Sequence, residues 1–453
     1  MTPALNVAIV GSGPSGFYAA EALMEALPAV EVSMLDRLPV PFGLVRSGVA
    51  PDHPKLKQSA IVYDRIARSD KIHFFGNIHV GVDVTVEELC QTHHCVIFAY
   101  GAEGHKSLDI PGESLRGSHT AREFVGWYNG HQDHRHLQFD LSQEIVAIIG
   151  QGNVALDVAR ILAKPVDELR TTDISEHSLD VLAGSRVRDI HIFGRRGPSH
   201  AKFSPRELGE FADISGCSPI VDAADLPPVH DDVANNGDRD TQRKLDLFRQ
   251  FSKSGHHANS RRCHFHFYHV PTAILGQERM AAIRFEKTSS DRDAVARNVD
   301  FPCGLLFRSV GYRGHAIAGV PFDEASGVLR HQAGRLVDRE GRSLYGMYAT
   351  GWIKRGATGI IGTNRADSLE TVETLISDLP FIGAEGKAGS VGLRALLWAR
   401  GKKTRRFSPV AADRQVRNCN RPSPRQATRK NDKPYGAFGC GGISLHAASV
   451  VAR

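Results

Sequence analysis

Short apolar runs recur along the chain and alternate with segments of helical period. The runs lie at 6–10, 30–35, 94–100, 145–149, 187–193 and 344–350. Glycine turns follow several of them, and a helical pattern such as FYAAEAL at 17–23 comes next. Since buried parallel strands are short and continuously apolar, this alternation favours doubly wound parallel sheets. The sequence therefore predicts an α/β fold.

The pattern starts twice, once near residue 6 and once near residue 145, so two α/β domains are expected. The run at 344–350 ends in a further glycine turn and comes long after the second start. This order indicates that the first domain is discontinuous and that the second is inserted into it. We place the connections near residues 105 and 328. The predicted domains are residues 1–105 with 328–400, and residues 106–327.

Length and composition agree with this division. A chain of 453 residues exceeds what one core usually supports, and 41% hydrophobic residues with 44 glycines suit a turn-rich globular protein. No run of about 18 apolar residues is present, so no membrane span is predicted, and the absence of a targeting pattern leads us to expect a cytoplasmic location. Seven cysteines form no C-x-x-C pair, so no metal site, cluster or dithiol centre is predicted.

The basic net charge of +6 comes from the C-terminal segment. From Arg400 onward there are 13 Lys/Arg and two Asp, which gives this segment +11 and leaves −5 for the remainder. Residues 401–453 have neither helical nor strand period and are predicted to be a basic, disordered tail. Only three aromatic residues accompany these charges, so no nucleic-acid partner is expected. Residues 215–260 are also polar and are expected to be a surface elaboration, with a helix at about 240–253.

The first glycine turn follows the strand at 6–10 directly. Gly11, Gly13 and Gly16 form a G-x-G-x-x-G at the end of a strand and the start of a helix. In this fingerprint the first glycine permits a tight turn, the second lets the backbone approach a pyrophosphate, and the third packs helix on strand. The next strand ends at Asp36, 25 positions after Gly11, which suits a ribose-binding acid. The alternative is a glycine turn that serves packing alone.

A second glycine turn begins at Gly150. It reads GQGNVA at 150–155, with an alanine in the third position that the fingerprint tolerates. The following strand ends not in an acid but in Arg195 and Arg196, and two guanidinium groups there suit a 2′-phosphate, which selects NADP over NAD. The alternative is a solvated arginine pair. An insertion at about 165–185 accounts for the 45 residues between Gly150 and Arg195.

Two dinucleotide sites on one chain define the class of chemistry. The acid-terminated site fits FAD and the arginine-terminated site fits NADPH, an arrangement that allows hydride transfer between nicotinamide and flavin. The predicted fold is therefore two Rossmann-like dinucleotide-binding domains, with the NADP domain inserted into a discontinuous FAD domain.

From Val7 to about Leu379 the sequence resembles adrenodoxin reductase and its bacterial homologues, the NADPH–ferredoxin reductases of that type. Four segments carry the resemblance: PVPFGLVRSGVAPDHP at 39–54, FVGWYNG at 124–130, GQGNVALD at 150–157 and GWIKRGATGIIGT at 351–363. Two departures are present. Ala357 replaces a proline common in the last motif, and the chain after about Arg400 does not resemble the family's C-terminal segment.

The resemblance implies contact residues for both cofactors. For FAD these are, beside the glycines of the first turn, Ser15, Asp36, Leu44, Val80, Trp352, Gly359, Ile360 and Ile361. For NADP they are Gln151, Asn153, Arg195, Arg196, Glu207 and Gly359, together with Gly150, Gly152 and Val154 of the second turn. Gly359 belongs to both sets because a residue without a side chain lets two rings stack closely.

The resemblance also implies a hydrogen-bonded pair beside the flavin, His53 and Asp157. An imidazole held by a carboxylate is able to relay protons near neutral pH. The alternative is that Asp157 merely lies in the helix behind Gly150 and that His53 caps a loop.

Together these features predict a flavoprotein that transfers electrons from NADPH through FAD to a one-electron iron–sulfur carrier, that is, a ferredoxin–NADP reductase. An acidic ferredoxin-like partner would require a basic surface. The candidates on the helix at 240–253 are Arg239, Arg243, Lys244 and Arg249. The alternative is that these residues form only a solvated helix face.

Other functions are compatible with parts of the sequence. An NADPH diaphorase acting on quinones or dyes would use the same two cofactors. A thioredoxin reductase is disfavoured because C-x-x-C is missing, and a glutamate synthase small subunit is disfavoured because its N-terminal cluster cysteines are missing. From a different class, the basic tail would suit a nucleic-acid-binding or redox-sensing module.

Overall fold

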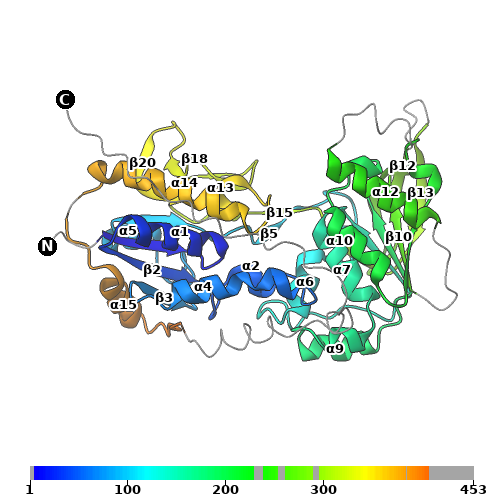
Figure 1. Cartoon of the computed structure of the whole chain (residues 1–453), viewed down its shortest axis with the longest axis horizontal. Helices are drawn as coiled ribbons and strands as arrows, with labels where there is room; N and C mark the ends of the chain where they lie inside the picture. Colours follow the sequence, from blue (N-terminus) through cyan, green and yellow to red (C-terminus); the bar gives the residue numbers. More distant parts are fainter. Residues whose placement is uncertain (1–4, 229–237, 254–260, 289–294, 384, 408–453) are drawn as a thin grey trace, which may run out of the picture.

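The computed structural model describes residues 5–407 except 229–237, 254–260, 289–294 and 384. Figure 1 shows two domains side by side, one coloured blue and yellow and the other mainly green. The blue and yellow segments come from the two ends of the described chain and share one sheet. The green domain is therefore inserted into a discontinuous partner, as the order of the sequence patterns predicts.

The first domain is built on a seven-stranded sheet with the order β18-β19-β20-β4-β1-β2-β3. Its strands are β1 (Leu5–Val10), β2 (Val30–Asp36), β3 (Ile72–Gly76), β4 (Cys95–Phe98), β18 (His331–Gln332), β19 (Arg335–Val337) and β20 (Ser343–Ala349). The strands from β20 to β3 run parallel, and β18 and β19 form an antiparallel edge. Val7 and Ile9 of β1 pack into the core on one face, and Ala8 and Val10 pack into the core on the other. Burial on both faces explains why this strand is continuously apolar.

Helices cover both faces of the first sheet. They are α1 (Pro14–Ala26), α2 (Gly43–Ser47), α3 (Pro54–Lys57), α4 (Ser59–Ala67), α5 (Val86–Thr92), α13 (Trp352–Arg355), α14 (Thr363–Asp378) and α15 (Gly389–Ala399). On one face Phe17 of α1 stacks on Tyr63 of α4, with ring centroids 5.2 Å apart. On the other face α5 and α15 contribute Leu89 and Leu393 to the core.

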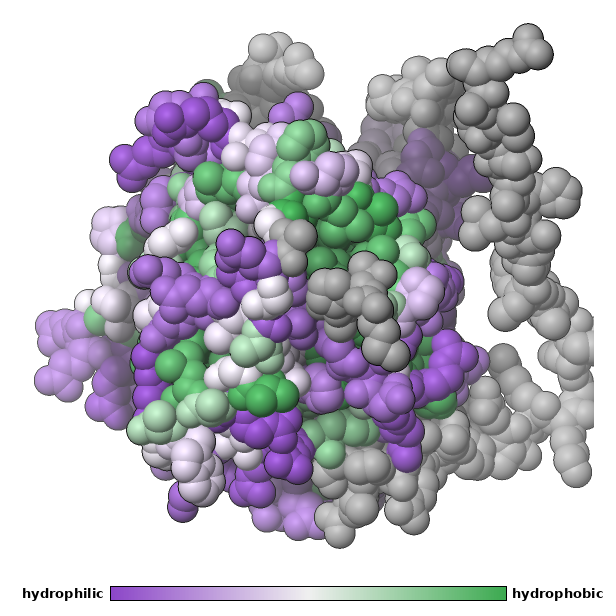
Figure 2. Space-filling model, turned by 90° about the vertical axis from the view of Figure 1, so that its left-hand side faces the viewer, coloured by the Kyte–Doolittle hydropathy of each residue, from purple (hydrophilic) through white to green (hydrophobic). Residues whose placement is uncertain are grey.

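The outer end of the first domain carries apolar patches among hydrophilic groups, as Figure 2 shows. The two faces of α15 differ: Leu393 and Leu397 are buried, whereas Val391 and Trp398 are 75% and 84% exposed. α15 therefore packs on the sheet through one side only.

The second domain has a six-stranded parallel sheet with the order β6-β14-β7-β8-β10-β9. Its strands are β6 (Ser118–Thr120), β7 (Ile145–Ile149), β8 (Asp189–Phe193), β9 (Cys217–Val221), β10 (Arg261–His266) and β14 (Leu305–Arg308). A three-stranded antiparallel sheet of β11 (His269–Gly276), β12 (Met280–Lys287) and β13 (Arg297–Pro302) covers one face. Helices cover the other face: α6 (Ala121–Tyr128), α7 (Asn153–Ala163), α8 (Val166–Leu169), α9 (Glu176–Ala183), α10 (Pro205–Gly209) and α12 (Arg239–Lys253).

Two short strands join the domains. β5 (Gly104–His105) and β15 (Tyr312–Arg313) pair antiparallel between them (Figure 1). The return connection therefore lies near residue 313, and the predicted position near 328 is wrong. β16 (Phe322–Asp323) and β17 (Val328–Leu329) form a small hairpin that already packs on the first domain, since Leu329 lies in its core. The sequence missed this point because the hairpin has no helical or strand period long enough to detect.

Two further expectations need correction. Residues 215–260 are not only a surface elaboration, because β9 is a strand of the sheet and α12 buries Phe248 and Phe251 in the domain core. The predicted tail at 401–453 begins too early. Gly76 and Arg405 exchange two backbone hydrogen bonds of 2.8 and 2.9 Å, and Phe407 packs against the core of the first domain. The remainder of the predicted tail lies outside the described residues.

The predicted insertion at about 165–185 is present as α8 and α9. These helices separate α7 from β8; α9 packs on α6 and α8 packs on α9, and Leu169 and Leu182 are buried. Among the described residues, no helix is long and apolar enough to cross a membrane.

Candidate active site

The first glycine turn joins β1 to α1 with its front face open. Gly11 has φ +109°, and a Cβ there would lie 2.5 Å from the Ala99 carbonyl oxygen. A Cβ on Gly16 would lie 2.2 Å from the Gly11 carbonyl oxygen, so helix and strand touch at this point. A Cβ on Gly13 would meet no atom within 4 Å. The turn therefore leaves space for a pyrophosphate at the N-terminus of α1, whose backbone N–H groups attract anions.

Asp36 ends β2 beside this turn. Its Oδ2 accepts hydrogen bonds from the Ser12 backbone N at 2.9 Å and from the Ser12 hydroxyl, and its Oδ1 accepts from the Leu38 N at 2.8 Å. Burial raises the pKa of Asp36 above its usual value, against the effect of these hydrogen bonds. The carboxylate is thus fixed in position beside the open turn, where a ribose-binding acid is required.

The other residues predicted for FAD converge on the same turn, with one exception. The Phe42 N donates to the Ser12 carbonyl oxygen at 2.9 Å, which brings α2 and Leu44 against the turn. A Cβ on Gly351 would lie 2.0 Å from the Ser15 Oγ, so the Gly351–Trp352 segment touches the start of α1. Val80 is the exception in that its side chain is buried in the core beside Val10 and Leu35, and its contact with FAD stays a prediction.

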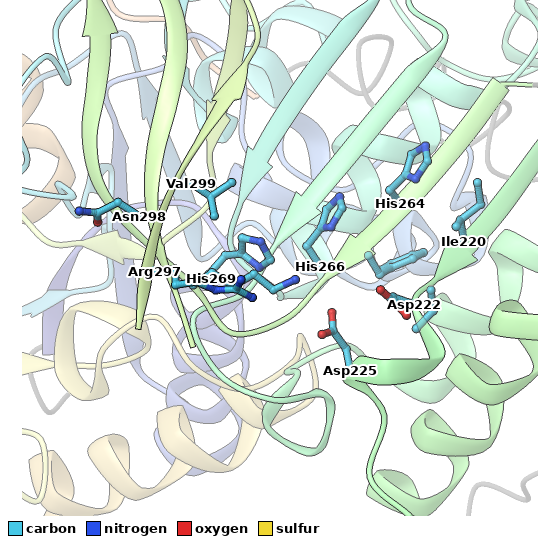
Figure 3. A pocket seen from close by; sticks show the side chains of 12 residues that line it. Ile220, Asp222, Asp225, His264, His266, His269, Arg297, Asn298 and Val299 are labelled. Carbon is cyan, nitrogen blue, oxygen red and sulfur yellow. The ribbon is translucent and has the colours of Figure 1, made fainter. Parts of the chain in front are cut away.

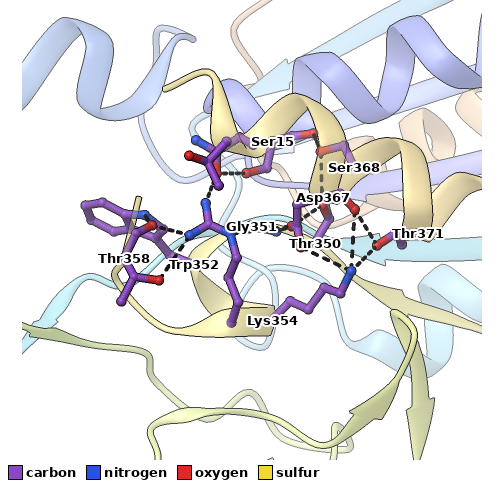
Figure 4. Close-up of polar contacts among 12 residues, drawn as sticks. Ser15, Thr350, Gly351, Trp352, Lys354, Thr358, Asp367, Ser368 and Thr371 are labelled. Atoms are coloured by element: carbon purple, nitrogen blue, oxygen red, sulfur yellow. Dashed lines mark hydrogen bonds and ion pairs between the residues drawn. The ribbon is translucent and has the colours of Figure 1, made fainter. Parts of the chain in front are cut away.

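A polar network that the sequence did not reveal holds the Gly351–Trp352 segment in place (Figure 4). Asp367 of α14 accepts from the Gly351 N and, at 3.0 Å, from the Thr350 Oγ1. Lys354 is 4% exposed and pairs with the same carboxylate at 3.1 Å. Since Asp367 comes four residues after Thr363, at the start of an ordinary-looking helix, no local signal in the sequence marks it.

Gly359, Ile360 and Ile361 lie just before α14. Gly359 has φ +80° and Ile360 is 75% exposed. The side chain of Asn364 in the first turn of α14 lies within 3.1 Å of the Ser15 Oγ, so this segment also approaches the first glycine turn. These positions are therefore able to contact a flavin bound there.

The second glycine turn repeats the geometry of the first. Gly150 has φ +128°, and a Cβ there would lie 2.1 Å from the Ser309 carbonyl oxygen, whereas a Cβ on Gly152 would meet no atom within 4 Å. Ala155 is fully buried behind the turn. The turn at β7 and α7 is thus open to a second pyrophosphate.

The segments predicted to bind NADP meet around this second turn. The Gln151 Nε2 donates to the His266 carbonyl oxygen at 3.0 Å, and the Asn153 Oδ1 accepts from the Ser204 N at 2.8 Å. Ser204 caps α10, which carries Glu207. Val154 packs against the core of the domain.

Arg195 and Arg196 follow the end of β8, and both are exposed. The neighbouring Gly194 is packed against the Gln151 side chain, where a Cβ would lie 2.0 Å from the amide carbon. The arginine pair is therefore held at the rim of the second turn with both guanidinium groups accessible to a phosphate.

The predicted hydrogen bond between His53 and Asp157 is absent. The His53 Nδ1 lies 3.9 Å from the Asp157 Oδ1, whereas its Nε2 donates to the Glu210 Oε2 at 2.8 Å. Arg160 comes between the two predicted partners: its Nη2 is 2.5 Å from the Asp157 Oδ1 and 3.5 Å from the His53 Nδ1. The Asp157 carboxylate is therefore engaged by an arginine, and Glu210 is the partner of His53.

Arg160 also joins the two domains. Its guanidinium is fully buried and donates to both oxygens of Asp52, at 2.6 and 3.1 Å, while Lys164 adds a third contact at 2.6 Å. Burial alone would raise the pKa of Asp52, but the charges of Arg160 and Lys164 outweigh it and hold the pKa well below its usual value. Arg160 lies three residues after Asp157 on α7, so the helical spacing could have indicated that the two share a face.

A second buried ion pair lies nearby. Lys57 of the first domain is 1% exposed, and its Nζ donates to both oxygens of Asp173 in the second domain, at 2.7 and 2.8 Å, and to Asn129 at 3.3 Å. The segment 52–57 thus carries several of the contacts between the domains and fixes His53 among them.

Comparison with known proteins agrees with this geometry. The sequence model of the pyridine nucleotide-disulphide oxidoreductase family matches residues 5–190. The chain is 41% identical over 417 residues to the mitochondrial NADPH:adrenodoxin oxidoreductase of Bos taurus, covering 87% of this chain and 84% of that protein. It is 42% identical over 386 residues to NADPH-ferredoxin reductase FprA of Mycobacterium tuberculosis, covering 82% of this chain and 84% of that one.

The chain belongs to the adrenodoxin reductase family.

A solved structure supports the same assignment at the level of the fold. The structure of Mycobacterium tuberculosis FprA in complex with NADPH superposes with a TM-score of 0.83 at 37% identity, over 91% of this chain and 95% of that one. Enzymes of the adrenodoxin reductase family bind FAD and NADP(H). The two open turns fit these cofactors, with the acid beside the first and the arginines beside the second.

We expect the buried pair of Asp52 and Arg160 to stabilise this adrenodoxin reductase-type fold. Asp52→Asn removes the carboxylate that binds both Arg160 and Lys164 and leaves Asp157 as the only carboxylate of the described residues in hydrogen-bond contact with the guanidinium, so it should lower the free energy of unfolding by about 3–5 kcal/mol. The folded-state pKa is lowered, so the contribution of the wild-type aspartate is present above its unfolded pKa of about 3.9 and is lost as the pH falls further. Urea unfolding of the FAD-loaded protein at pH 7 measures the effect.

A matched surface pair provides the control. Arg342→Ala removes an ion pair with Asp338 in which the arginine side chain is 76% exposed, and it should cost less than about 1 kcal/mol. Equal costs for Asp52→Asn and Arg342→Ala would contradict the assigned importance of the buried pair.

Glu207 gives the nucleotide site a pH dependence. Burial, with a further contribution from the negative charge of Asp157, raises the pKa of Glu207 to about 7, and its Oε2 is buried without a hydrogen-bond partner among the described residues. Above this pH the ionised carboxylate opposes an anionic ligand. We expect the dissociation constant of NADP⁺ to rise between pH 7 and 8 by up to about tenfold.

Glu207→Gln isolates this effect. The 2′-phosphate itself titrates with a pKa of about 6 and affects both proteins equally. Calorimetric binding of NADP⁺ from pH 6 to 8 should therefore show a flatter profile for the variant than for the wild type. Parallel profiles would show that Glu207 does not face the nucleotide.

Proposed function

We propose that this chain oxidises NADPH and passes the electrons through FAD to a ferredoxin-like iron–sulfur protein. The observation that carries the proposal is a pair of open glycine turns on one chain, one beside a fixed carboxylate and the other beside two exposed arginines. FAD supplies the conversion of a two-electron hydride donor into a one-electron donor. The protein supplies the positions of the two nucleotides.

The roles of the side chains follow from their contacts. Asp36 and the open turn at Gly13 hold the first nucleotide, and Arg195 with Arg196 grips the 2′-phosphate of the second. The His53 Nε2 donates a hydrogen bond to the Glu210 Oε2. Burial would raise the pKa of Glu210, but this hydrogen bond outweighs burial and lowers the pKa. Glu210 is thus ionised at neutral pH and orients the imidazole.

A coupled assay tests the proposed function. The purified protein is supplied with NADPH, a ferredoxin-type carrier and cytochrome c, and cytochrome reduction is compared with and without the carrier. Reduction that depends on the carrier supports the proposal. Equal rates without the carrier, with rapid reduction of quinones or dyes, would show instead an NADPH diaphorase.

The carrier is expected to dock on a basic surface, and the structure reduces the candidates for it. Lys244 is 7% exposed and donates to the Ala201 carbonyl oxygen, so its prediction as a docking residue is wrong. Arg249 has a side chain only 16% exposed and also donates to the Pro227 carbonyl oxygen at 3.3 Å. Arg239 and Arg243 are exposed on α12 and remain proposed docking residues.

We expect the double variant Arg239→Glu/Arg243→Glu to raise the KM for an acidic carrier about tenfold at low salt, because rim charges mainly affect electrostatic attraction. Dye reduction by NADPH should be unchanged. Arg342→Glu, an equally exposed change in the first domain, serves as the control. An unchanged KM at low ionic strength would exclude α12 as the docking surface.

We also propose a reducing, cytoplasmic location. The described cysteines are all free thiols, as is usual for proteins in reducing compartments: Cys90, Cys95, Cys217, Cys263 and Cys303. Cell fractionation followed by immunoblotting tests the location. Recovery with an organelle marker would contradict it.

A further inference from the structure

Three histidines lie together on neighbouring strands of the second sheet. His264 and His266 are two residues apart on β10, so their side chains project from the same face. His191 of β8 pairs in register with His264. The ring of Phe301, from the covering strand β13, lies 4.7 Å from the His191 ring. The strand register thus gathers three imidazoles under the small sheet, and we call them the histidine cluster.

The ring nitrogens of the histidine cluster lie close enough together to be candidate metal ligands. The His191 Nδ1 lies 2.9 Å from the His266 Nε2, and one nitrogen from each of the three rings lies within 4.8 Å of the others. Two nitrogens bound to one tetrahedral zinc ion, at Zn–N distances of about 2.0 Å, lie about 3.3 Å apart. The rings are stacked in this structure, with an angle of 3° between His191 and His264. A bound ion would replace the hydrogen bond between His191 and His266 by two metal–nitrogen bonds as the rings turn.

A carboxylate supports the cluster from outside. The Asp189 Oδ1 accepts from the His264 Nε2 at 3.1 Å. In metal sites a carboxylate on the second ring nitrogen fixes the tautomer and raises the basicity of the ligand.

The histidine cluster opens on a cleft. The cleft has a volume of about 750 Å³ and is lined by His264 and His266 together with Asp222, Asp225 and Lys287. Figure 3 shows His264 and His266 projecting from one strand, with Asp222 and Asp225 below them in this view. Three protein ligands with a fourth position open to water or another ligand are typical of zinc sites that are not purely structural.

We propose that His191, His264 and His266 bind a divalent transition-metal ion of the zinc type, with the fourth coordination position facing the cleft. Imidazole ligands suit Zn²⁺, Cu²⁺ and Ni²⁺. The His266 carbonyl oxygen accepts from the Gly194 N at 2.9 Å and from the Gln151 Nε2 at 3.0 Å. The ion would therefore link β8, which leads to Arg195, with β10, whose His266 carbonyl oxygen binds the Gln151 side chain. This site is independent of electron transfer and does not rest on the function proposed above.

Equilibrium dialysis with Zn²⁺ tests the proposal. Untagged, FAD-loaded protein is dialysed against zinc, and bound metal is measured by elemental analysis. We expect one zinc ion per chain above the level that remains in the double variant His191→Asn/His266→Asn. His264→Gln should weaken binding at least about tenfold, and Asp189→Asn should weaken it by about 10–100-fold.

The controls separate metal binding from folding and from catalysis. His73→Gln changes a histidine that contacts a carboxylate, Glu31, at 2.9 Å on a parallel strand of the other sheet, and it should leave zinc binding unchanged. Visible flavin absorbance and circular dichroism report whether each variant is folded. If the double variant does not fold, His264→Gln decides the question, because it changes one ring of the cluster, and the His264 side chain is 22% exposed.

Two results would overturn the proposal: no zinc bound by the wild type at micromolar concentrations, or equal binding by the wild type and the folded cluster variants, which would place the ion on other groups. NADPH oxidation is measured in parallel without zinc. If the wild type does not oxidise NADPH, the proposed function is contradicted. The metal site is then judged by dialysis alone.

Discussion

Gly13→Val is expected to weaken FAD binding about 1000-fold while the protein still folds. Gly13 has φ −82° and ψ −173°, which valine adopts readily, and its Cβ would meet no atom within 4 Å. The added methyl groups would occupy the space in front of the turn, where backbone N–H groups of α1 would donate hydrogen bonds to the pyrophosphate of FAD. Loss of these charge-assisted hydrogen bonds, about 4 kcal/mol in all, corresponds to about a 1000-fold weaker FAD affinity. Flavin content after purification and fluorescence titration with FAD measure it.

Two companion variants make this prediction specific. Gly152→Val places valine at φ −117° in the equally open second turn, and it should retain FAD but lose NADP binding. Gly16→Val should prevent folding, because its Cβ would lie 2.2 Å from the Gly11 carbonyl oxygen. A Gly13→Val protein that remains yellow would show that the first turn does not hold the pyrophosphate.

The second large effect concerns the choice between NADPH and NADH. Arg195→Ala/Arg196→Ala removes two guanidinium groups that are exposed at the rim of the second turn. Each charge-assisted hydrogen bond contributes about 1.5–3 kcal/mol, so kcat/KM for NADPH should fall by about 100-fold or more. The value for NADH should hardly change, because NADH has no 2′-phosphate. Steady-state dye reduction with both nucleotides measures the ratio.

Arg188→Ala is the matched control, since Arg188 is exposed and precedes the opposite end of the same strand, β8. It should preserve the preference for NADPH. A double variant that loses activity with both nucleotides equally would indicate damage to the turn rather than loss of phosphate recognition.

The parts of the fold that could be predicted are those in which burial forces a pattern. β1 and β7 lie in nearly continuous apolar runs because both faces of their sheets are covered, and the runs predicted for these two strands and for β2, β8 and β20 agree with the structure within one or two residues. The helical period predicts α12 correctly. The prediction that this helix lies only at the surface is wrong, because its many polar residues outnumber Phe248 and Phe251, which are buried. The hairpin of β16 and β17 was missed because strands of two residues have no detectable period.

The candidate site divides in a similar way. The glycines, Asp36 and the arginine pair could be predicted from the sequence, because the fingerprint places them at fixed positions relative to one strand and one helix. Contacts between the domains could not be predicted from the sequence. The Glu210 partner of His53 lies 157 residues away in the sequence, and the Asp52 partner of Arg160 lies 108 residues away. No periodicity relates such residues before the domains are folded together.

The sequence predicts no metal site because of its cysteine spacing. Cysteine spacing gives no information about ligands that come from different strands. His191 and His266 are 75 residues apart, and only the parallel register of β8 and β10 brings them together. The short spacing of His264 and His266 on one strand was the single local signal, and by itself it is compatible with an ordinary surface of a sheet.

Anaerobic titration of the purified protein with NADPH tests the central claim, that one chain places two nucleotides so that electrons pass from one to the other. The protein should be yellow as isolated, and its visible flavin absorbance should bleach with about one equivalent of NADPH, but only slowly with NADH. Protein that is colourless and takes up no FAD, or flavin that NADPH leaves oxidised, would contradict the account.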